Sequence, residues 1–117
     1  MSCTVRRASP ANAGPLARLN SEFNGMHMPL QLFRQSLSRT AGEAVFLAQT
    51  DHEAIGYACA LRLVSVCCRH PWVEVTEIYV HAGYRGQGVA AALMRAVEKH
   101  AQRRGAAQIV VMHFQRG

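Results

Sequence analysis

The chain has 117 residues, of which half are hydrophobic and 17% are charged, and its formal net charge is +6. This length and composition predict a single globular domain that spans residues 1–117. No apolar run approaches the roughly 20 residues that cross a bilayer, and no export signal is visible, so we expect a cytoplasmic protein without a membrane partner. The cysteines and histidines lack CxxC and HxxxH spacing, and we expect no metal site.

The first half of the chain predicts a strand, two helices and a hairpin. Residues 3–7 form a short strand pattern, and residues 12–23 and 30–39 carry apolar side chains at helical spacing. The segment Gly25–Pro29 breaks the helical pattern, so we expect an elbow between two short helices. Two further strand patterns, at residues 44–49 and 54–66, are separated by a polar turn and predict an antiparallel hairpin.

The second half predicts a strand, a helix and a strand. Residues 73–81 are rich in β-branched side chains, and an amphipathic helix follows from Val89 to a glycine cap at Gly105. The apolar run at residues 108–114 predicts a final, largely buried strand. The fold class is therefore α/β (α+β), a mixed sheet in the order β-αα-β-β-β-α-β. Its first strands are antiparallel, and a parallel β-α-β unit comes last.

A glycine-rich turn joins the strand at residues 73–81 to the following helix. Its sequence, Arg85-Gly86-Gln87-Gly88-Val89-Ala90, lets an anion approach backbone amides at a helix start without meeting a Cβ atom. A nucleoside triphosphate loop needs GxxxxGK[ST], which is absent here. A dinucleotide fingerprint fits the glycines, but it needs an acidic residue about 20 positions later, and Glu98 is the last acidic residue. Glycines that only permit a tight turn remain an alternative.

The third candidate ligand of the glycine-rich turn is the pyrophosphate of coenzyme A. The pattern Arg85-x-x-Gly88-x-Ala90 resembles the [Q/R]-x-x-G-x-[G/A] signature of the GNAT superfamily of N-acetyltransferases. The resemblance extends upstream through EIYVHAGYRG and downstream to QIVVMHF, and the element order also matches the family. It implies direct transfer of an acetyl group from acetyl-CoA to a primary amine of an acceptor.

The resemblance also implies which residues form the site. The backbone of the fourth strand would bind the pantetheine arm, and the turn would bind the pyrophosphate, which together make the cofactor-binding set Ile78, Val80, Arg85, Gly86, Gln87, Gly88, Val89 and Ala90. Glu77 occupies a position where some members carry a general base, although a solvated strand glutamate is the alternative. The acceptor is expected near Met26–Met28 and the loop at residues 69–72.

The charge pattern leaves other partners open. All but one of the 13 basic residues are arginine, which suits phosphate groups, but their dispersal along the chain argues against nucleic acid as a partner. The positive balance argues mildly against polyamine acceptors.

The sequence departs from the family's pattern at its end. Members usually continue past the fifth strand with a helix and a strand pair that carries a tyrosine acid, and no such segment occurs before Gly117. No general acid is therefore assigned. We expect that a homodimer could form through the exposed edge of the last strand. A partial or catalytically impaired acyl-CoA-binding module is the alternative function.

Overall fold

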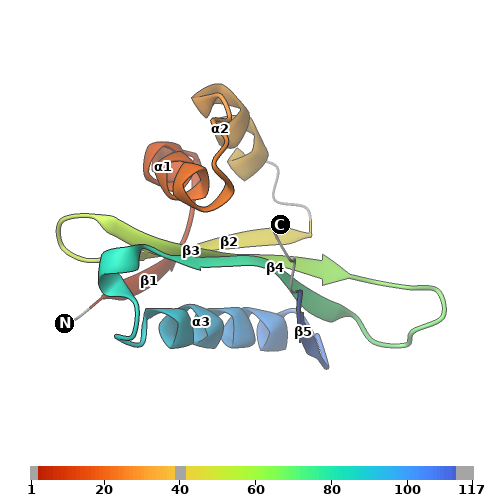
Figure 1. Cartoon of the computed structure of the whole chain (residues 1–117). Helices are drawn as coiled ribbons and strands as arrows, with labels where there is room; N and C mark the ends of the chain where they lie inside the picture. The colour runs from red at the N-terminus through yellow and green to blue at the C-terminus, as the bar shows by residue number, and fades with distance from the viewer. Residues whose placement is uncertain (1–2, 39–41, 113–117) are drawn as a thin grey trace.

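The computed structural model describes residues 3–38 and 42–112, which form one five-stranded sheet flanked by helices (Figure 1). The strands are β1 Thr4–Arg7, β2 Glu43–Gln49, β3 Ala54–Leu63, β4 Trp72–Val80 and β5 Ile109–Val111. The α-helices are α1 Ala13–Asn24, α2 Leu30–Ser38 and α3 Val89–Arg103, and the short 3₁₀ turns are η1 Pro10–Asn12 and η2 Ala82–Tyr84. This is the predicted element order.

The sheet has the spatial order β1-β2-β3-β4-β5. Each pair from β1 to β4 is antiparallel, and β4 pairs with β5 in parallel. Helices α1 and α2 lie on one face of the sheet, and α3 lies on the other (Figure 1). The predicted mixed sheet with a terminal parallel β-α-β unit is confirmed.

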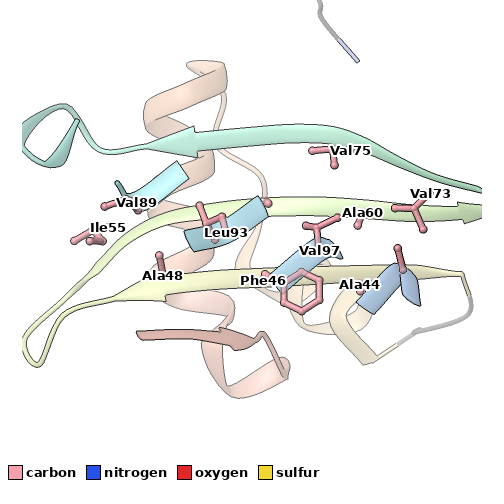
Figure 2. Close-up of a cluster of buried hydrophobic side chains, with 12 residues drawn as sticks. Ala44, Phe46, Ala48, Ile55, Ala60, Val73, Val75, Val89, Leu93 and Val97 are labelled. Atoms are coloured by element: carbon pink, nitrogen blue, oxygen red, sulfur yellow. The ribbon is translucent and has the colours of Figure 1, made fainter. Parts of the chain in front are cut away.

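The core between α3 and the sheet combines alanines and larger apolar residues of the strands, such as Phe46 and Ile55, with branched residues of the helix (Figure 2). Leu93 and Val97 of α3 are fully buried, as their helical spacing predicts. The facing strands contribute alanines, which allow the helix to approach the sheet closely: Ala44, Ala48, Ala58 and Ala60. This packing fixes α3, and with it the turn that precedes α3.

A glycine in β3 is part of this close packing. A Cβ atom at Gly56 would lie 2.8 Å from the Tyr79 carbonyl oxygen, and 3.4 and 3.5 Å from Val89 and Leu93 side-chain atoms. We therefore expect Gly56→Ala to lower the free energy of unfolding by about 1–3 kcal/mol, because the backbone of β4 or α3 must shift. Urea denaturation measures this change.

Gly14 provides the matched control for that substitution. A Cβ atom there meets nothing within 4 Å, and Gly14 lies within α1. Gly14→Ala should be neutral or stabilising by less than about 1 kcal/mol, because alanine favours helix. Equal stability of the two variants would contradict the close packing at Gly56.

Two strands are shorter than the sequence pattern predicts. β3 ends at Leu63 rather than residue 66, because the chain turns where the Cys68 N–H donates to the Ser65 carbonyl. β5 covers only Ile109–Val111, and its residues are half-buried or exposed because it pairs on one side alone among the described strands. The rest of the predicted last strand, residues 113–114, lies outside the described residues.

β4 contains a β-bulge that controls which face each residue occupies. Cys59 pairs with Glu77 while the next residue, Ala60, pairs with Val75, so Thr76 is the extra residue. Val75 therefore packs in the core on the α3 side, whereas Glu77 lies on the side of α1 and α2. Without the bulge, strand alternation would place these two side chains on the same face.

Candidate active site

The turn between β4 and α3 has the backbone conformation that an anion site needs. Gly86 and Gly88 have φ angles of +76° and +85°, a region that residues with a Cβ atom rarely adopt. The first helical hydrogen bond runs from the Ala92 N–H to the Gly88 carbonyl, at 3.0 Å. The N–H groups of Val89, Ala90 and Ala91 therefore precede the helical ladder and point out of the helix start.

The two glycines of this turn face open space. A Cβ atom at Gly86 or Gly88 would meet no other atom within 4 Å, and both residues are exposed. Free amides together with the positive end of the α3 dipole suit a phosphate group. The turn therefore fits a pyrophosphate, which the glycines would allow to approach the backbone.

The side chains of this turn have other roles. The Arg85 Nε–H donates to the Val80 carbonyl at 2.9 Å, and its guanidinium lies 5.7 Å from the centre of the Tyr79 ring. The Gln87 amide donates to the Gly83 carbonyl at 3.3 Å, and the Val89 side chain is buried in the core. Of the predicted set at residues 85–90, the backbone is thus the part that is available to a ligand.

The end of β4 offers a second set of backbone groups. The His81 N–H donates to the Ile55 carbonyl of β3, so by alternation the N–H groups of Ile78 and Val80 point away from β3. The pairing of β4 with β5 covers only Val73–Val75. The backbone at Ile78 and Val80 therefore faces an open edge in the described structure, where an extended ligand could pair with it.

A cavity of about 250 Å³ lies on the face of the sheet that carries α1 and α2, between these helices and strands β2 to β4. Its walls include apolar side chains of α1, α2 and β2, namely Leu16, Phe33, Leu37 and Val45. Glu77 lines the cavity, together with Glu43 and Cys59. Met28 of the predicted elbow also lines it, whereas the loop at residues 69–72 does not.

Three donors hold one oxygen of Glu77. The Tyr57 hydroxyl donates to Oε1 at 2.7 Å, and the side-chain amides of Asn20 and Asn24 donate to the same oxygen at 3.3 Å each. Asn20 also donates to the Tyr57 hydroxyl oxygen at 3.0 Å. These contacts fix the carboxylate, and they leave its second oxygen, Oε2, available to a ligand in the cavity.

Burial and nearby negative charges raise the pKa values of three groups in this cavity. Burial, and then the hydrogen bond to Glu77, raise the pKa of Tyr57 far above its ordinary value, so the phenol remains a donor. Burial and the negative charges of Glu77 and Glu43 raise the pKa of the Cys59 thiol, which remains neutral. Partial burial and the charge of Glu77 also raise the pKa of Glu43.

The other polar residues near the end of β4 form a separate group. The Tyr79 hydroxyl donates to Glu22 Oε1 at 2.9 Å, and His81 Nδ1 lies 2.7 Å from the same oxygen. The hydrogen bond with His81 lowers the pKa of Glu22. Tyr79 and His81 lie on the α1 side of the sheet like Glu77, as alternation predicts, but they do not line its cavity.

Sequence reasoning missed Asn20, Asn24, Tyr57 and Glu43. A signal for the two asparagines exists, because Leu16, Asn20 and Asn24 follow each other at four-residue spacing and therefore share a helix face. Polar side chains on a face that begins with a buried leucine indicate a polar site beneath the helix. Tyr57 and Glu43 carry no comparable signal, because their proximity to Glu77 depends on strand pairing.

The described residues show two further properties. Residues 3–38 and 42–112 contain no group of three or more histidine, cysteine or acidic side chains arranged to hold a metal ion. No helix of this part of the chain has the length and apolar character to span a bilayer.

Comparison with known proteins identifies the family. Residues 15–116 match the model of the acetyltransferase (GNAT) family. An aminoglycoside N(6′)-acetyltransferase type 1 from Stenotrophomonas maltophilia is 36% identical over 106 residues, which cover 81% of this chain and 65% of that protein. The chain belongs to the acetyltransferase (GNAT) family, as the glycine-rich turn and the element order predict.

Solved structures agree with this fold. A ribosomal-protein-alanine N-acetyltransferase from Brucella melitensis biovar Abortus 2308 has a TM-score of 0.84 at 20% identity, over 97% of this chain and 82% of its own. AAC(6′)-Iy, in complex with the bisubstrate analogue CoA-S-monomethyl-acetylneamine, has a TM-score of 0.85 at 21% identity, over 100% of this chain and 83% of its own. At these identities the likeness concerns the fold.

Proposed function

We propose that the protein transfers an acetyl group from acetyl-CoA to a primary amine of a cationic acceptor of the aminoglycoside type. The observation that carries this proposal is the arrangement around residues 77–80 of β4. In this stretch the hydrogen-bonded carboxylate of Glu77 faces the cavity, and the backbone N–H groups of Ile78 and Val80 face the open edge of β4. The glycine-rich turn, which we assign to the pyrophosphate, follows this stretch. The 36% identical relative supports the aminoglycoside acceptor.

The cofactor-binding residues of this proposal are those of the turn and of the β4 edge. The backbone amides from Arg85 to Ala90 bind the pyrophosphate, and the backbone of Ile78 and Val80 binds the extended arm. In this scheme the Val80 N–H donates to the thioester oxygen, while the Val80 carbonyl accepts from Arg85. Bound acetyl-CoA supplies a thioester carbon, to which the amine nitrogen bonds as the carbon–sulfur bond breaks.

Glu77 acts as the general base in this scheme. A primary ammonium has no lone pair, so it must lose a proton before its nitrogen can attack. Glu77 Oε2 accepts that proton while Oε1 remains bound to Tyr57, Asn20 and Asn24. A second proton leaves the nitrogen as the amide forms, and one proton is taken up by the departing thiolate. The residue that delivers this proton is not assigned.

The experiment that tests this function is turnover with a matched pair of acceptors. We expect thiol release from acetyl-CoA, and one acetyl group added, with an aminoglycoside that carries a 6′-amino group. The analogue with a 6′-hydroxyl group should react far more slowly, because it lacks the nucleophile at that position. Tight binding of CoA without thiol release for any amine would contradict the enzyme and indicate an acyl-CoA-binding module.

A further inference from the structure

The cavity that contains Glu77 is more acidic than the protein as a whole. The chain carries a formal charge of +6, yet two carboxylates, Glu43 and Glu77, line this cavity with a single basic side chain, Arg7. The Arg7 guanidinium donates to the Glu43 backbone carbonyl at 3.3 Å. In the described part of the chain neither carboxylate forms an ion pair, since the pair found there joins Glu22 to His81.

The two carboxylates are held apart by the sheet. Val45 of β2 pairs with Cys59 of β3, which pairs with Glu77 of β4, and Glu43 lies two residues from Val45 on the same face. Two strand spacings from Glu77 to Val45, and two residues along β2 from Val45 to Glu43, place the Glu43 and Glu77 backbones roughly 12 Å apart. Their negative charges still interact: burial first, and then the charge of Glu77, raises the pKa of Glu43.

The surface between the two carboxylates is largely apolar. Val45 and the neutral thiol of Cys59 lie on the sheet between them, and Leu16, Phe33 and Leu37 cover the cavity from the helices. Such a cavity suits a carbon skeleton with a positive group at each end. An ammonium group near each carboxylate would also relieve their mutual repulsion.

We propose that Glu43 is a specificity-determining residue that binds a second ammonium group of the acceptor, while Glu77 binds the ammonium group that is to be acetylated. The inference rests on the proposed function and narrows its acceptor to diamines and polyamines, including aminoglycosides. The net positive charge of the chain argued mildly against polyamines, but the local charge of the cavity has the opposite sign.

The test compares binding of linear α,ω-diamines of graded chain length with monoamines of the same length, by titration calorimetry on the CoA-bound protein. We expect one range of diamine lengths to bind at least about tenfold more tightly than the matched monoamines, which corresponds to about 1.4 kcal/mol. Glu43→Gln should remove this preference and leave monoamine binding unchanged. With a diamine that is acetylated, Glu43→Gln should raise KM with little change in kcat.

Asp51→Asn provides the charge control, because Asp51 is exposed in the β2–β3 turn and does not line the cavity. Equal binding of diamines and monoamines would overturn the inference. The inference would also be overturned if Glu43→Gln weakened diamine and monoamine binding equally, or if Asp51→Asn removed the preference for diamines as Glu43→Gln does. Equal acetylation of monoamines and diamines would contradict the role of Glu43 in specificity but support the acetyltransferase activity. Diamine-selective binding without thiol release would support the role of Glu43 but contradict the acetyltransferase activity.

Discussion

Glu77→Gln is expected to lower kcat/KM for amine acetylation roughly 100- to 10,000-fold, the usual contribution of a general base. A carboxamide cannot take the proton from the ammonium group. Its oxygen can still accept from Tyr57, Asn20 and Asn24, so the cavity should keep its shape. Steady-state kinetics with acetyl-CoA and a reactive amine measure the loss.

Two controls separate a catalytic role of Glu77 from a structural one. CoA affinity should be unchanged in Glu77→Gln, because the β4 edge and the glycine-rich turn lie outside the cavity. Glu74→Gln makes the same chemical change in the same strand, where Glu74 accepts from the Trp72 indole N–H and does not line the cavity. It should retain full activity. An active Glu77→Gln variant would show that another group removes the proton.

Gly88→Ala is expected to weaken CoA binding by at least about tenfold. A methyl group at Gly88 would stand in the open space from which the pyrophosphate approaches the amides. It also adds strain of about 1–2 kcal/mol, because the φ angle of +85° is unfavourable for alanine. Calorimetric titration with CoA measures the affinity, and thermal unfolding measures the strain.

Gly105→Ala controls for the strain. Gly105 has a φ angle of +71°, its Cβ atom would also meet nothing within 4 Å, and it lies at the opposite end of α3. The two variants should therefore lose similar stability, but only Gly88→Ala should lose CoA affinity. Equal CoA affinity in both would refute the assignment of the turn as the pyrophosphate site.

The order of elements could be predicted from the sequence because each element carries its own periodicity. The apolar spacing of Leu93 and Val97 defines one buried face of α3, and the structure buries both. Gly25 ends α1 with a φ angle of +68°, as the predicted elbow requires. Strand ends were less predictable. Val64 and Val66 favour a strand by type, yet both are exposed, because a turn begins at Ser65.

The candidate site could be predicted only in its local part. The glycine-rich turn is contiguous in sequence, so its pattern is visible without tertiary structure. The partners of Glu77 come from α1 and β3 and are 20 to 57 residues away. Glu43 reaches the same cavity through the pairing of β2 with β3, and no local pattern of polarity reports that register.

The extra residue in β4 gives this strand one residue of tolerance in its length. Upstream of Thr76 the odd-numbered residues Val73 and Val75 belong to the α3 core, and downstream the even-numbered Ile78 and Val80 pack there. Loss of Thr76 would make Val75 and Glu77 consecutive, opposite Ala60 and Cys59, which are already consecutive in β3. Ordinary alternation would then keep Val75 in the α3 core and Glu77 on the side of α1 and α2, so a gap at this point removes the bulge and retains the carboxylate. A gap between Glu77 and Val80 would instead change the face of Glu77 or of the residues that follow it.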